Sequence, residues 1–181
     1  PPDVTDDLRR VLEDAGIETD RDLVARILAT GVGLGLDDTD RLDLKITSAA
    51  LTEMRAAFRL FAPYRDVSKV TIFGSARTRP DDALYRAAVD VAAALAARGW
   101  FVVTGAGPGI MQAAAEGAGP EHSLGVSIRL PFEEKPNALV AEADRVVAMK
   151  YFFTRKLMLV KESRGFVCVP GGFGTLDEMF E

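Results

Sequence analysis

The sequence predicts an α/β fold, in which a doubly wound parallel sheet follows a helical N-terminal extension. Two observations carry this prediction. Short apolar runs alternate with helical patterns from residue 67 to residue 181, and three of these runs end in glycine-rich turns. Residues 1–66 show helical periodicity without such alternation. We therefore expect a helical extension over residues 1–66 and an α/β domain over residues 67–181.

The N-terminal 66 residues are expected to form helices. Apolar residues recur at helical spacing in two segments, and Asp20 is placed to cap the second segment. Three glycines within residues 31–35 are expected to break the pattern as a flexible connector. A third helix is expected over residues 48–61, because Pro63 follows it. This region shows no catalytic constellation, and we interpret it as a packing or oligomerisation appendage.

Strands and helices are expected to alternate after residue 67. The predicted strands are short apolar runs, at 70–73, 100–103, 124–128, 146–148 and 165–169. The predicted helices lie at 85–98, 110–116 and 151–162, and from residue 176 onward. Asp81 or Asp82 is expected to cap the first of these helices, and Gly99 to end it. Ligands of such sheets bind beyond the carboxyl ends of the strands, so the glycine-rich turns are expected to converge on one cleft.

The most informative turn is Pro-Gly-Gly-Phe-Gly-Thr-Leu-Asp-Glu, at residues 170–178. Its glycines, Gly171, Gly172 and Gly174, leave backbone N–H groups open to a ligand because they carry no Cβ atom. The N-terminus of the following helix favours an anion. We therefore expect a phosphate group at this turn.

Two interpretations of Thr175 and Glu178 remain open. The pair matches a capping box, in which the Glu178 carboxylate accepts a hydrogen bond from the Thr175 N–H. The neighbouring glycines favour the alternative, in which Thr175 binds phosphate and Glu178 is a catalytic carboxylate. Arg155 lies on a largely apolar helix, where a guanidinium requires an anionic partner. Lys156 beside it is a candidate phosphate ligand, although both cations could instead form a solvated pair.

The turn at residues 105–109 resembles a dinucleotide fingerprint but lacks its third glycine, because Ile110 occupies that position. Arg129 stands where that motif places an acidic ribose ligand, which disfavours NAD. Neither glycine turn precedes the Lys-Ser/Thr pair of a Walker loop, which disfavours ATP hydrolysis. Ser75, after Gly74, can donate a hydrogen bond to phosphate or serve as an ordinary turn residue.

Composition narrows the function classes. The net charge is −5 over 181 residues and basic residues do not cluster, so no nucleic-acid partner is expected. The apolar runs are too short to span a membrane, and we expect no signal peptide. The single cysteine, Cys168, is expected in the core and fits a cytoplasmic protein. With one histidine and one cysteine, a zinc site is not expected. We expect no cofactor, and a further C-terminal portion after Glu181.

Four motifs together resemble the LOG ("Lonely guy") family of cytokinin riboside 5′-monophosphate phosphoribohydrolases, whose members are often mislabelled lysine decarboxylases. They lie at residues 73–77, 105–111, 153–156 and 170–178, and the last is highly specific. Ala106 departs from the pattern, since many members have glycine there. The resemblance implies a Rossmann-like fold, a homodimer, a catalytic pair of Arg155 and Glu178, and a phosphate site at Gly172, Gly174 and Thr175.

The resemblance also implies a reaction, the hydrolysis of the N-glycosidic bond of a nucleoside 5′-monophosphate such as AMP. An ionised Glu178, favoured by the nearby helix N-terminus, is expected to stabilise the ribosyl cation and activate water. Arg155 is expected to orient this carboxylate. The base is expected against the turn formed by Gly107, Gly109 and Met111, with Met149 or Phe132 as apolar walls.

Other functions remain open at this level. One is a general purine 5′-mononucleotide nucleosidase that acts on AMP, GMP or IMP. Another is a non-catalytic carrier of nucleotides or of molybdenum cofactor, and a third is a structural partner that acts through its N-terminal helices. The presence of both Arg155 and Glu178 favours an enzyme, because phosphate binding alone needs only the glycines. A decarboxylase would need a pyridoxal Schiff-base lysine, for which no lysine here has a recognisable context.

Overall fold

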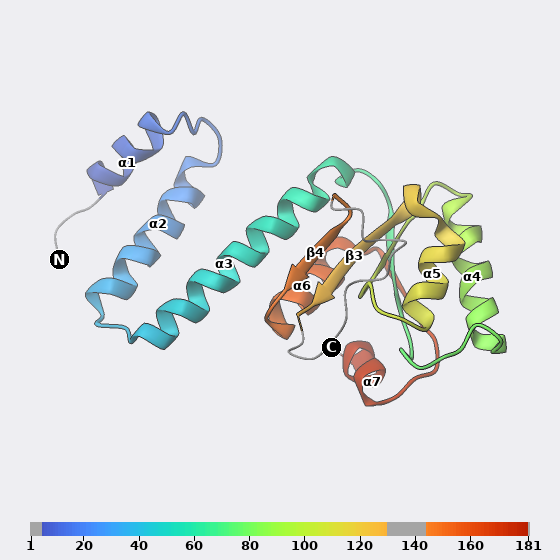
Figure 1. Cartoon of the computed structure of the whole chain (residues 1–181). Coiled ribbons are helices and arrows are strands. Elements are labelled where there is room, and N and C mark those ends of the chain that lie inside the picture. Colours follow the sequence, from blue (N-terminus) through green and yellow to red (C-terminus); the bar gives the residue numbers. More distant parts are fainter. Residues whose placement is uncertain (1–4, 130–143, 181) are drawn as a thin grey trace. The chain divides into compact units, whose positions relative to one another are not determined.

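The computed structural model describes residues 5–129 and 144–180 (Figure 1). The chain forms two compact units, Pro1–Ala49 and Ala50–Glu181. Helix α3 (Arg41–Phe61) carries the last residues of the first unit and the first residues of the second. None of the described helices has the length and hydropathy needed to cross a bilayer.

The first unit contains α1 (Thr5–Asp14), α2 (Arg21–Leu36) and the start of α3. The expectation of a flexible connector at residues 31–35 is wrong, because α2 continues through all three glycines. Each glycine weakens a helix by about 1 kcal/mol relative to alanine but does not forbid it. Asp20 does not cap α2 as expected, since it has left-handed backbone angles and its side chain accepts no capping hydrogen bond.

Helix α3 begins seven residues earlier than the expected residue 48. The signal for this start is Asp40, whose carboxylate accepts hydrogen bonds from the N–H groups of Leu42 and Asp43, the latter at 3.0 Å. Such N-caps satisfy N–H groups that have no partner within the helix. The end of α3 at Phe61 agrees with the sequence prediction, and a short 3₁₀ turn (Ala62–Tyr64) follows.

The second unit is built on a five-stranded parallel sheet, which confirms the predicted fold class. Its strand order is β4-β3-β2-β1-β5. The strands are β1 (Lys69–Phe73), β2 (Phe101–Thr104), β3 (Ser123–Ile128), β4 (Val146–Met149) and β5 (Gly165–Cys168). The chain direction across the sheet reverses at β1, so the topological switch point lies between β1 and β5. In open α/β sheets, ligands bind outside the carboxyl ends of the strands at this point.

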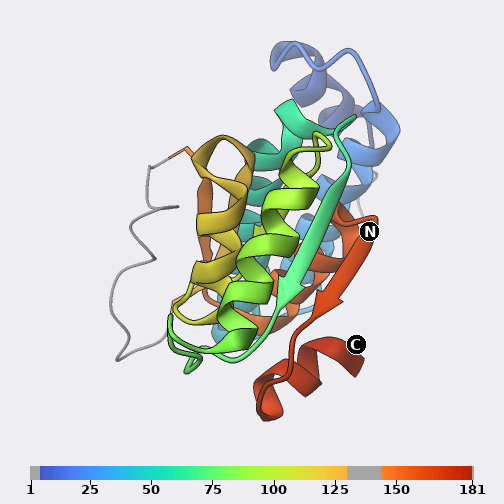
Figure 2. The same ribbon diagram turned by 90° about the vertical axis from the view of Figure 1, so that its right-hand side faces the viewer.

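Helices cover both faces of the sheet. Figure 2 shows α4 (Ala83–Ala96) and α5 (Ile110–Ala118) side by side over one face, where they bury a cluster that includes Ile72 and Val102. As predicted, Asp82 caps α4 by accepting the Leu84 N–H at 2.8 Å. On the other face, α6 (Phe152–Glu162) and the end of α3 pack over Val126 and neighbouring strand residues.

Strand β5 is an edge strand that pairs with β1 in the described part of the chain. The expectation that Cys168 lies in the core is wrong, since its side chain is exposed. An edge strand beside a single neighbour leaves part of its surface uncovered, and the exposed Phe166 shows the same effect. The last helix, α7 (Phe173–Phe180), begins three residues before the expected position and lies beyond the carboxyl ends of β1 and β5 (Figure 2).

Candidate functional site

The three glycine-rich turns meet at the carboxyl ends of β1, β2 and β5. A Cβ atom on Gly74 would lie 2.6 Å from the Ile110 side chain, and one on Gly109 would overlap the Ser75 carbonyl. The Ile110 N–H donates a hydrogen bond to this same carbonyl at 3.1 Å. A Cβ atom on Gly171 would lie 3.0 Å from the Ser75 backbone nitrogen. The backbone of Ser75 is therefore the point at which all three turns converge.

The turn after β2 makes room for an arginine. A Cβ atom on Gly105 would overlap the Arg155 guanidinium and approach the Met111 sulfur to 2.8 Å. A Cβ atom on Gly107 would approach the Met111 methyl carbon to 2.7 Å. Between these glycines, Ala106 has a φ of 55°, a left-handed conformation that favours glycine. Close packing, rather than loop flexibility, explains why glycines occupy positions 105 and 107.

Arg155 is held in a single orientation by two charge-assisted hydrogen bonds. It extends from the first turns of α6 and is only 6% exposed. Its Nε donates to the Val126 carbonyl of β3 at 3.0 Å, and its Nη1 donates to Glu178 Oε1 at 2.6 Å. The anionic partner that a buried arginine requires is thus Glu178 on α7, 23 residues along the chain.

A second carboxylate, missed by the sequence analysis, fixes the start of α6. Glu53 on α3 accepts hydrogen bonds from the Lys150 N–H at 2.7 Å, the Tyr151 N–H at 3.3 Å and the Thr154 hydroxyl at 2.8 Å. The two N–H groups belong to the residues just before α6, and the hydroxyl belongs to its first turn, so Glu53 ties α3 to the segment that enters the helix. No local motif marks Glu53, because its partners lie about a hundred residues away. Arg155 follows directly after this anchored turn.

The structure does not form the capping box that the sequence allowed. Because α7 begins at Phe173, Thr175 lies inside the helix and its N–H donates to the Gly172 carbonyl at 3.0 Å. The Glu178 carboxylate is hydrogen-bonded to Arg155 instead. Glu178 is the sixth residue of α7 and lies beyond the first turn, where the helix dipole favours an anion. The expectation that the helix N-terminus favours the ionised form of this carboxylate is therefore wrong. The positive charge beside this carboxylate is the Arg155 guanidinium.

The first residues of α7 present open backbone N–H groups. Among the residues that the structure describes, no acceptor pairs with the N–H groups of Gly172, Phe173 and Gly174. Gly171 is explained by packing, since its Cβ would collide with Thr175. For Gly172 and Gly174, no described atom lies within 4 Å of an added Cβ, and neither has a positive φ. Contacts within the described chain therefore give no reason for glycine at these two positions.

The remaining predicted residues occupy varied surroundings. Lys156 forms an ion pair with Asp177 at 2.9 Å, and Thr175 is 8% exposed. The Ser75 hydroxyl oxygen accepts the Arg77 N–H at 3.1 Å, as a turn serine does, and retains its own proton for another acceptor. Met149 is fully buried in the core, so the expectation that it lines the site is wrong. Phe132 lies outside the described residues.

The model of the SLOG cluster4 family matches residues 67–181. The chain belongs to this family. The chain is 32% identical over 102 residues to the cytokinin riboside 5′-monophosphate phosphoribohydrolase of Mycobacterium tuberculosis (strain ATCC 25618 / H37Rv), and this match covers 54% of this chain and 53% of that protein. It is 35% identical over 100 residues to the probable cytokinin riboside 5′-monophosphate phosphoribohydrolase LOGL5 of Oryza sativa subsp. japonica, covering 52% of this chain and 39% of that protein.

The chain thus spans about half the length, or less, of these curated relatives. A solved structure of the molybdenum cofactor carrier protein from Chlamydomonas reinhardtii has a similar fold, with a TM-score of 0.50 and 21% sequence identity. The likeness covers 63% of this chain and 69% of that protein. At this identity it supports the fold of the SLOG cluster4 domain alone.

Proposed function

We propose that this SLOG cluster4 protein hydrolyses the N-glycosidic bond of a purine nucleoside 5′-monophosphate, giving the free base and ribose 5-phosphate. The observation that carries the proposal is the ion pair between the buried Arg155 on α6 and Glu178 on α7, because α7 is also the helix that begins with the open N–H groups. The names of the curated relatives support the same activity. A cytokinin riboside monophosphate and AMP are the proposed substrates.

The 5′-phosphate binds the backbone N–H groups of Gly172, Phe173 and Gly174 at the start of α7. Unpartnered N–H groups at a helix N-terminus form a natural anion site, and the absence of a side chain at two of these positions lets phosphate approach closely. The Ser75 hydroxyl can donate a further hydrogen bond from the adjoining turn. Binding energy at this remote group orients the ribose for reaction at C1′.

Glu178 acts on the ribose. Its Oε1 is held by Arg155, whereas its Oε2 accepts no hydrogen bond from any residue that the structure describes. The side chain is 17% exposed, so it is partly open to solvent. As the bond from C1′ to the base nitrogen breaks, its electron pair leaves with the base and positive charge develops on the ribose. The carboxylate stabilises this charge and accepts a proton from the attacking water, while the departing base takes up a proton from solvent, to which Glu178 later returns its own.

Arg155 is a positioning residue in this scheme. Its bond to the Val126 carbonyl fixes the guanidinium, which in turn fixes Glu178. Its positive charge also offsets the repulsion between this carboxylate and the substrate phosphate.

The proposal is tested by measuring base release from AMP, GMP, IMP and isopentenyladenosine monophosphate. Native protein should release at least one of these bases, and Glu178→Gln should lower kcat by at least about a hundredfold because the neutral amide cannot stabilise the cation. Glu121→Gln, which changes a carboxylate that is 82% exposed, is the matched control. Nucleotide binding without base release by the native protein would instead support a carrier.

A further inference from the structure

Two ion pairs between neighbouring residues hold α7 to α6. Arg155 Nη1 lies 2.6 Å from Glu178 Oε1, and Lys156 Nζ lies 2.9 Å from Asp177 Oδ2. Arg155 and Lys156 are consecutive on α6, and their two partners are consecutive on α7. Consecutive residues of a helix project about 100° apart, so the two pairs contact α7 at different points around its axis. The proposed function uses the first pair and gives the second no role.

Helix α7 has little apolar packing of its own. Thr175 is the one buried residue of this helix among those described, and it packs against Gly171 at the start, where the open N–H groups lie. The large apolar side chains are exposed by 92% for Phe173, 41% for Leu176, 49% for Met179 and 78% for Phe180. The position of the second half of α7, which carries Glu178, therefore depends largely on the two ion pairs.

The Lys156–Asp177 pair constrains α7 in a way that the Arg155–Glu178 pair does not. The Arg155–Glu178 contact is one hydrogen bond between two long side chains, so α7 can turn about it while the bond persists. A second bond from the neighbouring residues opposes such a turn. The Lys156 side chain is only 16% exposed, and partial burial strengthens an ion pair relative to one in open solvent.

We propose that Lys156 and Asp177 are positioning residues for the proposed reaction. Their ion pair fixes the rotation of the second half of α7 and so keeps Glu178 Oε2 directed at C1′ of the ribose. This inference rests on the proposed function. In this role Lys156 acts through Asp177, rather than as the phosphate ligand that the sequence suggested.

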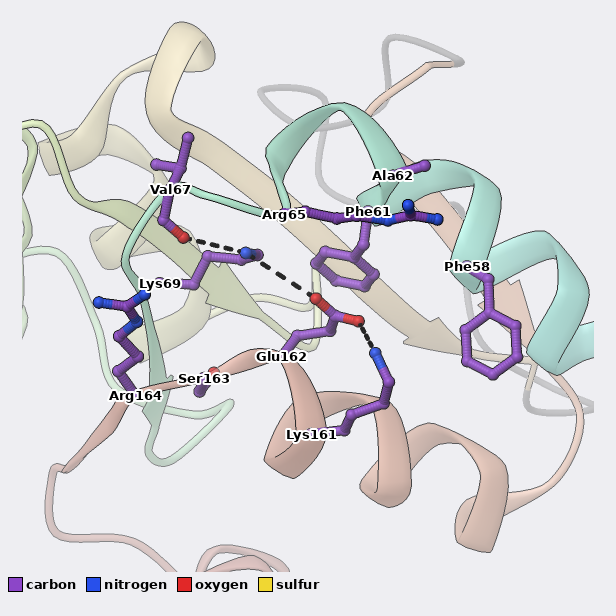
Figure 3. Close-up of a pocket in the computed structure, with 10 residues that line it drawn as sticks. All are labelled: Phe58, Phe61, Ala62, Arg65, Val67, Lys69, Lys161, Glu162, Ser163 and Arg164. Carbon is purple, nitrogen blue, oxygen red and sulfur yellow. Dashed lines mark hydrogen bonds and ion pairs between the residues drawn. The ribbon is translucent and has the colours of Figure 1, made fainter. Parts of the chain in front are cut away.

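The other end of α6 carries charged groups that serve as a comparison. Figure 3 shows Glu162 between Lys69 and Lys161, whose Nζ atoms lie 3.8 Å and 2.5 Å from its carboxylate oxygens. Lys69 is the first residue of β1, and parallel strands place their amino ends together. This cluster is therefore separated from the glycine-rich turns by the length of the strands. Lys161, which is 51% exposed, is a control on the same helix for the loss of a lysine charge.

The test is the steady-state kinetics of Lys156→Met, Asp177→Asn and the double variant with both changes. The substrate is the nucleotide that the native protein hydrolyses fastest among the four named above. Methionine keeps an apolar stem in place of the lysine, and asparagine keeps the shape of the aspartate. Because Asp177 is 62% exposed, its neutral substitute can be solvated, and the fold should persist. Lys161→Met and Glu121→Gln are the matched controls.

Each single variant should lower kcat roughly tenfold, because Glu178 is no longer held in the reactive orientation. KM should change less than about twofold, because the start of α7 still binds the phosphate. The double variant should also lose about tenfold, since both changes remove the same bond. Both controls should keep the native kcat.

Two results would overturn the positioning role alone. A raised KM in Lys156→Met, together with native kinetics in Asp177→Asn, would make Lys156 a phosphate ligand. A native kcat in both single variants would show that the pair does not affect Glu178. If the native protein hydrolyses none of the four nucleotides, the proposed function fails, and the positioning role fails with it.

Discussion

At the residue scale, the glycines of the turn after β5 divide into two kinds. Gly171 is required by packing, because a Cβ atom there would lie 2.8 Å from the Thr175 Cβ and even closer to its hydroxyl oxygen. Gly172 and Gly174 meet no such contact. We expect Gly172→Ala to alter the free energy of unfolding by about 1 kcal/mol or less, as a helix-start substitution does, while weakening AMP binding roughly tenfold.

Gly171→Ala is the matched comparison. It should destabilise the fold by about 1 to 3 kcal/mol, because the added methyl forces α7 away from Ser75. Thermal unfolding and equilibrium binding of AMP measure both effects. Equal AMP affinities for Gly172→Ala and the native protein would contradict the assignment of this N–H group to phosphate.

The buried Tyr85 is expected to make the free energy of unfolding depend on pH in the alkaline range. Its ring is 4% exposed, and its hydroxyl lacks a hydrogen-bond partner of good geometry among the described residues. Burial, followed by the nearby Glu116 carboxylate, raises the pKa of Tyr85 to about 12. The folded state therefore keeps its proton between pH 10 and 12, where an unfolded tyrosine loses it. The stability linked to this proton is fully present below pH 10 and is lost as the pH rises towards 12.

Tyr85→Phe should remove this dependence, which amounts to about 2 to 3 kcal/mol of unfolding free energy over that interval. Denaturant unfolding at pH 8 and at pH 11.5 measures it. The native protein should lose more stability than Tyr85→Phe between these two pH values. An equal loss in both proteins would show that Tyr85 ionises as easily in the folded state as in the unfolded chain.

At the scale of elements, the start of α6 depends on a carboxylate from α3. Glu53 binds two backbone N–H groups and the Thr154 hydroxyl there, and Arg155 extends from the same turn. Glu53→Ala should lower the unfolding free energy by about 1 to 2 kcal/mol. It should also lower kcat at least about tenfold, because a displaced Arg155 no longer holds Glu178 in place.

The control for this prediction is Glu121→Ala, which removes a carboxylate that is 82% exposed. It should leave both the unfolding free energy and kcat close to native values. A Glu53→Ala protein with reduced stability and native kcat would show that the contact supports the fold without positioning Arg155.

Local patterns in the sequence predict most of these helices and strands, but they do not predict which elements pack against one another. Apolar periodicity located all five strands and the helices between them, because each buries one surface against the sheet. The start of α3 was missed because its signal is the Asp40 cap rather than apolar spacing. The exposure of Cys168 depends on strand order, which places β5 at an edge and which no local pattern encodes.

The candidate site could likewise be predicted only in part from the sequence. The glycine turns were visible in the sequence, and the strand topology explains why they meet at Ser75. Because a buried arginine requires an anion, the sequence predicts an anionic partner for Arg155 without identifying the residue. Glu53 could not be identified in this way. A carboxylate on a predicted helix is normally exposed, and nothing near Glu53 in the sequence indicates the distant groups that it binds. The catalytic roles of Arg155 and Glu178 remain proposals.

At the scale of the whole molecule, the proposed extension over residues 1–66 is testable by truncation. Ala57 and Phe61 are 0% and 2% exposed and belong to the core cluster beneath α6. A chain of residues 50–181 should therefore keep the thermal stability of the second unit. A chain of residues 67–181 should unfold at a lower temperature, because it exposes the apolar surface that these two residues cover. Equal melting temperatures would place the boundary of the folded unit after residue 66.

Cleavage of the bond between base and ribose is distinguished from other reactions of a nucleotide by the products that the protein forms from AMP. Phosphorus and proton NMR spectra of one reaction mixture identify both products. We expect free adenine together with a phosphate monoester signal from ribose 5-phosphate, and no turnover in Glu178→Gln. Adenosine with inorganic phosphate would rule out cleavage at C1′, because the phosphate held by the α7 amides would then be the reacting group. Unchanged AMP with the native protein would contradict the assignment of AMP as a substrate.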